Sequence, residues 1–224
     1  MLPALTLAAI IGVILGVTAA PRAGSVPDSA LTAISLFGYS VPIFWLGQML
    51  VIVFAIQLGW LPVQGMKNMR DELTGFDAVA DVFLHLVLPG FSVMIFYIAI
   101  VARVARASVG EALHHDYVLT AKAKGLSRRT ILWRHVLPNA MIPVITVIGY
   151  NFGQSLTGAI LVETVFAWPG LGNLFITSIT NRDYPVLQGI FLVTAVSVVV
   201  INILTDLLYA LLDPRVRSSH EPRA

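Results

Sequence analysis

The charged residues of this chain fall into clusters, and long, nearly uncharged stretches separate them. A helix that crosses the apolar core of a bilayer needs about 20 residues. Five stretches are long enough, and Pro42 is expected to kink the second; they are residues 2–20, 29–58, 82–106, 139–162 and 186–212. No alternation of apolar and polar residues is sustained, which argues against a transmembrane β-barrel. The sequence therefore predicts an all-α, polytopic membrane protein.

Composition supports this class and excludes several others. Only 12% of the 224 residues are charged, whereas a soluble domain carries about 25% charged residues. The formal net charge of +2 is too small for a nucleic-acid-binding protein, so no nucleic acid partner is expected. The absence of cysteine excludes disulfides, thiolate nucleophiles, iron–sulfur clusters and cysteine-ligated zinc. Because neither a phosphate-binding loop nor a hydrolase motif occurs, we expect no enzyme activity and no cofactor held by this chain.

The basic residues predict the orientation, because cytoplasmic loops are enriched in lysine and arginine. The segment 103–137 carries seven of them, namely Arg103, Arg106, Lys122, Lys124, Arg128, Arg129 and Arg134. With five alternating spans, 11 basic residues fall on that side and three on the other, which are Lys67, Arg70 and Arg182. The sequence therefore predicts a cytoplasmic C-terminus, including a tail at 213–224, and an external N-terminus.

The first predicted span begins at the very start of the chain, with no polar flank. It inserts with a bare external N-terminus, or an upstream span is missing from this chain. A secretory signal peptide is the alternative, and Ala19-Ala20 fits its cleavage site, but no basic segment precedes the apolar stretch. A missing span agrees best with the predicted topology.

The long cytoplasmic loop, residues 108–137, is predicted to form two short helices. Asp116 is placed to cap the first, Gly125 to end it, Ser127 to cap the second, and Pro138 to mark the turn into the next span. The result is a helix-Gly-helix elbow on the membrane surface. Two interpretations are open from the residues alone: a basic loop lying on anionic lipid headgroups, or a docking element for a protein partner.

Ala121, Gly125, Leu137 and Pro138 resemble the cytoplasmic signature loop of permease subunits in binding-protein-dependent ABC importers, with proline 13 positions after glycine. The stretch Asp116–Ser127 is close to the form of this loop in the dipeptide, oligopeptide and nickel branch.

Two positions depart from the general signature, since Leu119 stands where glutamate is usual and His135 where isoleucine is usual. The resemblance continues along almost the whole chain, through Ser40–Gly47, Leu58–Pro62, Glu163–Gly172, Arg182–Pro185 and Asp206–Arg215. The segment around Trp168 looks like the first of the two permeases that such systems pair. Members of this kind carry an additional N-terminal span, so the resemblance also implies that this chain is N-terminally truncated or its start misassigned.

The resemblance implies that residues 1–212 form the transmembrane domain of a type I ABC importer in a bacterial inner membrane. Its partners would be a second permease, two cytoplasmic ATPase subunits that bind the ATP, an external solute-binding protein and membrane lipid. The solute would be a dipeptide, an oligopeptide, a glutathione-like molecule or a nickel complex. The loop residues implied to couple to the ATPase are Asp116, Tyr117, Ala121, Lys122, Ala123, Lys124, Gly125, Leu126, Leu137 and Pro138.

Polar residues inside the fourth span share one face, because Asn151, Gln154, Ser155 and Gly158 recur at intervals of three and four. This face either lines the solute path or packs against another helix, as the Gly149-x-x-x-Gly153 spacing also suggests. In the fifth span, Asp206 is expected to pair with a basic residue such as Arg103 or Arg215 rather than to carry ions. A secondary transporter or channel subunit without an ATPase remains the alternative function.

Histidines give no metal site. His114 and His115 are adjacent and point about 100° apart on a helix, and no further ligand lies at a suitable spacing. His85 near Asp81 is predicted to be an interfacial residue and not a proton relay.

Overall fold

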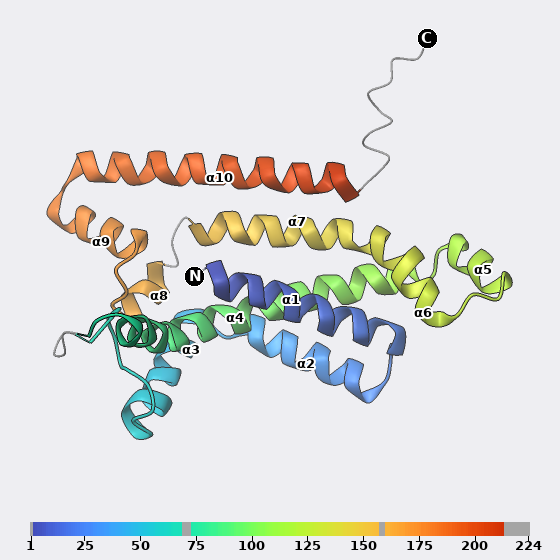
Figure 1. Cartoon of the computed structure of the whole chain (residues 1–224), viewed down its shortest axis with the longest axis horizontal. Coiled ribbons are helices and arrows are strands. Elements are labelled where there is room, and N and C mark those ends of the chain that lie inside the picture. Colours follow the sequence, from blue (N-terminus) through green and yellow to red (C-terminus); the bar gives the residue numbers. More distant parts are fainter. Residues whose placement is uncertain (1, 69–72, 157–159, 213–224) are drawn as a thin grey trace, which may run out of the picture.

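The computed structural model describes residues 2–68, 73–156 and 160–212, and all regular structure in these ranges is helical (Figure 1). The elements are α1 (Leu2–Ala19), η1 (Ala20–Arg22), α2 (Val26–Ser40), α3 (Ile43–Leu50), η2 (Val51–Gln57), α4 (Phe76–Ala112), α5 (Asp116–Ala123), α6 (Arg128–Ile131), η3 (Leu132–Val136), α7 (Leu137–Leu156), α8 (Ile160–Val165), α9 (Leu171–Asn181) and α10 (Tyr184–Leu212).

Five of these helices run along the long axis of the molecule in alternating directions: α1, α2, α4, α7 and α10 (Figure 1). Within the described residues, four helical segments are long and apolar enough to cross a membrane, and the bent pair formed by α2 and α3 with η2 adds a fifth if it is one span. The elbow formed by α5 and α6 lies at one end of the axis, and α8 and α9 lie at the other. This arrangement is the one that five alternating passes require.

The second predicted span, 29–58, is broken and not merely kinked. Helix α2 ends at Ser40, and the segment that begins at Ile43 turns by 95°. Val41 is extended, with φ −78° and ψ 125°, because the ring of Pro42 disfavours helical backbone at the preceding residue. With 15 residues, α2 is about 22 Å long at ~1.5 Å per residue, shorter than a bilayer core.

Two other predicted boundaries differ from the structure. Helix α4 has 37 residues and extends the predicted 82–106 span at both ends, with Pro89 buried inside it. Helix α7 ends at Leu156, so residues up to 162 do not all continue the fourth span; Val162 lies in the separate helix α8. Helix α1 together with the start of η1 covers the stretch predicted at 2–20, and α10 covers the stretch predicted at 186–212.

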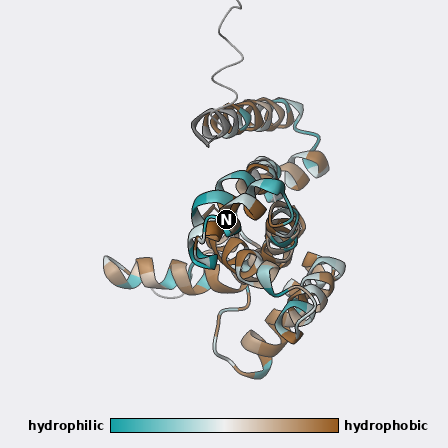
Figure 2. Ribbon diagram, turned by 90° about the vertical axis from the view of Figure 1, so that its right-hand side faces the viewer, coloured by the Kyte–Doolittle hydropathy of each residue, from teal (hydrophilic) through white to brown (hydrophobic). Residues whose placement is uncertain are grey.

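Small residues let α1 and α4 approach closely at the centre of the molecule. A Cβ at Gly12 would lie 2.8 Å from that of Val101, and one at Gly16 would meet the backbone of Ala102 and the side chain of Ala105. Such close approach is how membrane helices associate without a hydrophobic driving force. The end view in Figure 2 shows α10 at the edge, away from this central group. Many of its large apolar side chains are exposed, Phe191 among them.

Candidate coupling site

The N-cap of α5, the first helix of the elbow, is one residue earlier in the chain than the sequence predicts. The N-cap is His115, with φ −74° and ψ 152°, and its side chain makes no capping hydrogen bond. Asp116 is the first helical residue and not the cap. Its carboxylate still lies at the positive end of the helix dipole, where a negative charge is stabilising.

Gly125 ends α5, as the sequence predicts, because its φ of +76° is a left-handed conformation that favours glycine. The Gly125 amide donates to the Lys122 carbonyl at 2.9 Å, and the Leu126 amide donates to the Ala121 carbonyl at 3.2 Å. These two bonds form a Schellman motif, which satisfies the last carbonyls of the helix. A Cβ at Gly125 would meet nothing within 4 Å in this chain, so the glycine is needed for its backbone angle and faces open space.

The second half of the elbow is capped by Ser127, whose hydroxyl accepts a hydrogen bond from the Thr130 amide at 3.2 Å. From there the chain stays helical through α6, η3 and α7, so Pro138 marks no turn and lies in the first turn of α7. The five-residue π-helix η3 precedes it, and the Leu137 amide bonds to the Leu132 carbonyl. The wider π turn accommodates the ring and the missing amide of Pro138.

The inner face of the elbow is anchored to the ends of three long helices. Val118 and Ala121 are buried in one apolar cluster whose other buried members are Val17, Ala20, Val109, Ala112, Ile131, Val136 and Ala140. Tyr117 and Leu137 pack partly buried against the same cluster. Because α1, α4 and α7 all contribute to this cluster, a displacement of α5 must displace the ends of those helices as well.

The outer face of the elbow is free within this chain. Leu119, which is not in the predicted coupling set, is 60% exposed, and Leu126, which is, is 37% exposed. The other exposed members of the predicted set are Asp116, Lys122, Ala123, Lys124, Gly125 and Pro138. The predicted set therefore divides into exposed residues and the anchoring residues Tyr117, Ala121 and Leu137. Exposed apolar side chains with polar residues beside them are a feature of protein interaction surfaces.

The polar residues predicted to share a face of the fourth span have different surroundings. Asn151 is only 7% exposed and lines a small pocket beside Tyr97. Gln154 is exposed and donates to the Tyr150 hydroxyl at 2.7 Å, while Ser155 bonds to the Phe152 carbonyl of its own helix. Gly158 lies outside the described residues.

The face of α7 that carries Gly149 and Gly153 packs against α10. A Cβ at Gly149 would overlap the Thr205 side chain, and one at Gly153 would lie 3.9 Å from Ile201. The helix-packing interpretation thus applies to the glycines, whereas Gln154 stays accessible on the surface of this chain.

Two arginines of α4, Arg103 and Arg106, hold α2 against α4. The Asp28 carboxylate, 3% exposed, pairs with Arg106 through two hydrogen bonds, one of them 2.7 Å long, and also accepts from the Gly24 amide. Arg103 lies over the Tyr39 ring, 5.2 Å from its centre, and donates to the Ser35 carbonyl. Arg103 is therefore engaged with α2, and the side chain of its suggested partner Asp206 is not among those described.

At the opposite end, Asp81 accepts a hydrogen bond from the Asn68 amide at 2.6 Å and lies 3.4 Å from the His85 imidazole. These contacts tie a loop to α4. No group of three or more metal-ligating side chains occurs in the part of the chain that the structure describes.

Sequence reasoning missed the role of Glu163. This carboxylate is 6% exposed and accepts hydrogen bonds from the Gly172 and Asn173 amides, at the start of α9. The signal for it was available, since a glutamate precedes a Pro-Gly-Leu-Gly stretch whose glycines make room for it.

Comparison with protein families identifies one match. The family described as "Binding-protein-dependent transport system inner membrane component" matches residues 12–218.

Curated proteins with similar sequences are permeases. A probable peptide ABC transporter permease protein of Sinorhizobium fredii is 46% identical over 207 residues, covering 92% of this chain and 64% of that protein. A di/tripeptide transport system permease protein of Pseudomonas aeruginosa is 41% identical and covers 96% and 68%. An oligopeptide transport system permease protein of Bacillus subtilis is 39% identical and covers 96% and 67%. The chain thus spans about two thirds of the length of these relatives.

Among solved structures, a chain of the MetNI methionine ABC transporter in an inward-facing conformation superposes with a TM-score of 0.66. The match covers 95% of this chain and 92% of that chain, at 15% sequence identity. The two chains therefore share the fold of a type I importer transmembrane domain.

Proposed function

The chain belongs to the family of binding-protein-dependent transport system inner membrane components, and from this membership we propose that it lines the path of a peptide through an ATP-driven importer. The solute in the proposal is a short peptide, because the similar permeases carry peptide, di/tripeptide and oligopeptide in their names. Hydrolysis of ATP is assigned to separate subunits, and this chain performs no catalysis.

The elbow is the observation that carries the proposal. Its outer face presents Leu119, Leu126 and lysines to the surroundings, while its inner face is packed on the ends of α1, α4 and α7. An ATPase subunit bound to the outer face could move the elbow, and the packed cluster would pass that movement to the spans. A loop that only rested on lipid would not need this rigid connection to three helices.

The proposed assembly contains a second permease, two ATPase subunits and an external solute-binding protein. The exposed apolar side chains of α10 and α3 are available to lipid and to the second permease. The elbow end faces the cytoplasm in this proposal, together with the C-terminal end of α10, and the whole multi-pass chain lies in a bacterial inner membrane. The basic side chains Lys122, Lys124, Arg128 and Arg129 at the elbow support that orientation.

Within the fourth span, Gln154 is proposed to contact the solute, because its amide is exposed on α7. Asn151 and Ser155 are proposed to shape the same stretch of the path from the more buried side of the helix. An uncharged amide suits peptide backbone groups, since it both donates and accepts hydrogen bonds.

The proposal is tested by reconstitution. The chain is co-expressed with the second permease and the ATPase subunits of its own genome, purified through a tag on this chain, and placed in liposomes with the binding protein. We expect the ATPase to co-purify and a labelled dipeptide to accumulate only with ATP on the ATPase side. Accumulation without ATPase subunits would instead support a secondary transporter, and co-purification without uptake of any peptide would refute the proposed solute.

A further inference from the structure

The first turns of α4, residues 76–87, lie outside the bundle of long helices. None of these residues is buried, and the first α4 side chain to enter an apolar cluster of the described chain is Leu88. Helix α4 meets the start of α1 only at Gly90, where a Cβ would lie 3.6 Å from that of Ala4. The proposed function uses the packed part of α4, so it does not account for the first turns.

Helix α4 bends where it leaves the bundle, at Pro89. Figure 1 shows its first turns nearly end-on, whereas its later turns run along the long axis, and in Figure 2 the first turns extend sideways from the central helices. Proline lacks the amide that would bond to the carbonyl four residues earlier, and its ring clashes with that carbonyl. Residues 90–112 rise about 34 Å at ~1.5 Å per residue, enough to cross a bilayer core of about 30 Å. The bend therefore lies near a membrane surface, and the first turns run across the direction of the span.

One face of the first turns is apolar and exposed. Phe76, Val79 and Phe83 recur at intervals of three and four residues, so they share a face of the helix. Their exposed fractions are 84%, 66% and 67%. Neighbouring Leu84 is 47% exposed. Three large side chains on one face, each more than half exposed, form a surface that needs a cover.

The other face of the first turns is polar and is engaged within this chain. Asp77, Asp81 and His85 recur every four residues and are the only polar side chains of residues 76–87. The Asp81 carboxylate accepts from the Asn68 amide at 2.6 Å and lies 3.4 Å from the His85 imidazole. The loop that precedes α4 is thus held on the polar face, and the apolar face is turned away from it.

We propose that the first turns of α4 lie flat in the surface of the bilayer leaflet opposite the elbow, with Phe76, Val79 and Phe83 among the acyl chains. An amphipathic helix in this position buries its apolar face about 5–10 Å into the boundary between headgroups and acyl chains. Lipid fits better than a protein partner, because the apolar face carries no charge to pair with one. The apolar surface also continues past the bend, where Phe91 of the membrane-crossing part is 44% exposed.

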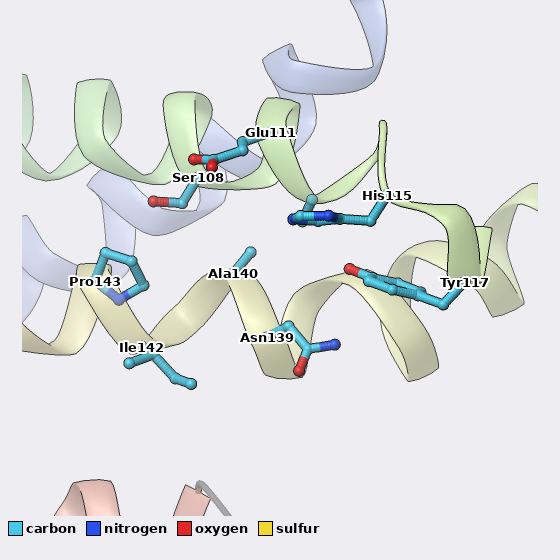
Figure 3. A pocket seen from close by; sticks show the side chains of 9 residues that line it. Ser108, Glu111, His115, Tyr117, Asn139, Ala140, Ile142 and Pro143 are labelled. Carbon is cyan, nitrogen blue, oxygen red and sulfur yellow. The ribbon is translucent and has the colours of Figure 1, made fainter. Parts of the chain in front are cut away.

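This anchor would hold α4 at both of its ends. At the elbow end, Figure 3 shows Ser108 and Glu111 of α4 across from Ala140 of α7, beside the start of α5. At the other end, the contact between Asp81 and Asn68 would bring the loop before α4 to the membrane surface as well. The anchor needs only a membrane and does not depend on the proposed transport function, so it can be tested on the chain alone.

The test uses the absence of native cysteine. Phe76→Cys, Phe83→Cys and Asp77→Cys, each in the full chain, are labelled with an environment-sensitive fluorophore and placed in phosphatidylcholine nanodiscs. Lipids that carry a nitroxide near the headgroup or deep in the acyl chain quench the fluorophore and report its depth. We expect the shallow nitroxide to quench both phenylalanine positions at least about twofold more than position 77, which is also exposed but lies on the polar face. A flat helix puts positions 76 and 83 at equal depth, whereas an upright helix would separate them by about 10 Å.

Weak quenching at both phenylalanine positions, or a clear difference in depth between them, would overturn the proposal. Circular dichroism of each labelled variant confirms that the helices are intact. The measurement is then repeated in the assembly with the second permease, the ATPase subunits and the binding protein. Quenching that persists supports lipid as the partner, and quenching lost on assembly would show that a protein covers the face and would also overturn the proposal.

Discussion

The Glu163 carboxylate lies 2.7 Å from the backbone nitrogen of Gly172 and thereby joins α8 to the first turn of α9. The same oxygen accepts from the next amide, so one buried side chain satisfies two of the free donors at the start of that helix. Gly170 and Gly172 border the carboxylate closely, and a Cβ at Gly170 would overlap it. The Glu163–Gly172 motif is therefore a structural connection at the end of the molecule opposite the elbow.

Glu163→Ala should destabilise the α8–α9 unit by about 1–2 kcal/mol, because it leaves two amide donors without an acceptor. Glu163→Gln keeps one acceptor oxygen and should cost less. Limited proteolysis of the detergent-solubilised chain measures this as faster cleavage between Val165 and Leu171. Gly110→Ala is the control for effects of substitution and purification that do not involve Glu163, since a Cβ at Gly110 meets nothing within 4 Å. Equal cleavage rates for Glu163→Ala and wild type would contradict the assigned role.

The ion pair between Asp28 and Arg106 should be coupled, because each charge is compensated by the other between α2 and α4. Asp28→Asn and Arg106→Gln are each expected to lower the thermal midpoint, and the double variant should lose less than the sum of the two. Differential scanning fluorimetry of the wild type, the two single variants and the double variant gives the four thermal midpoints of a double-mutant cycle. Asp77→Asn, at an exposed position of α4, should leave the midpoint nearly unchanged. Strict additivity would show that the pair contributes no interaction energy.

Gly149→Leu should weaken the packing of α7 on α10, because any side chain there would overlap Thr205. Even Gly149→Ala is expected to be less stable than wild type, by about 1–3 kcal/mol for overpacking. Gly153→Ala is the matched control, since its Cβ would lie 3.9 Å from Ile201. Thr205→Ala in the Gly149→Ala background should restore part of the loss, as measured by resistance to denaturing detergent. A larger effect at Gly153 than at Gly149 would be inconsistent with this packing.

Gly125→Trp should uncouple the ATPase while leaving membrane abundance nearly unchanged, because the residue is exposed and meets nothing within this chain. The left-handed φ adds ~1 kcal/mol of strain for a residue with a side chain. Gly125→Asn separates strain from bulk, since asparagine tolerates that backbone region. We expect pull-down of the ATPase and dipeptide uptake to fall sharply for tryptophan and modestly for asparagine. Normal uptake and ATPase binding with tryptophan would favour the lipid-surface interpretation, because tryptophan is favourable at an interface.

The absence of native cysteine makes the orientation directly testable. Trp60→Cys, at a 68% exposed position of the loop after η2, should react with a membrane-impermeant maleimide in intact spheroplasts. Leu126→Cys, on the outer face of the elbow, should react only after permeabilisation. This orientation is predicted from the excess of basic residues on the elbow side, 11 against three on the other side. Labelling of Leu126→Cys in intact spheroplasts would reverse the proposed topology.

Local signals in the sequence predicted the elbow well and its continuation poorly. Gly125 and Ser127 act through their own backbone angle and their own hydroxyl, so their roles follow from the residues next to them. Pro138 was expected to mark a turn, and it lies inside a continuous helix because the π-helix before it absorbs the ring. Such a distortion is not encoded by proline alone, since it depends on how the flanking turns pack.

The sequence by itself determined that the chain is helical and built to lie in a membrane, which helices carry the basic residues, and where the elbow bends. These properties follow from apolar length, charge position and backbone preference, which are local quantities. Tertiary structure decided that the break expected at Pro42 becomes a turn of 95°, that Asp28 selects Arg106 on α4, and that Asn151 is enclosed while Gln154 is exposed. Each of these depends on which helices become neighbours, and neighbours are chosen by the shape of whole packed faces, a property that no single segment contains.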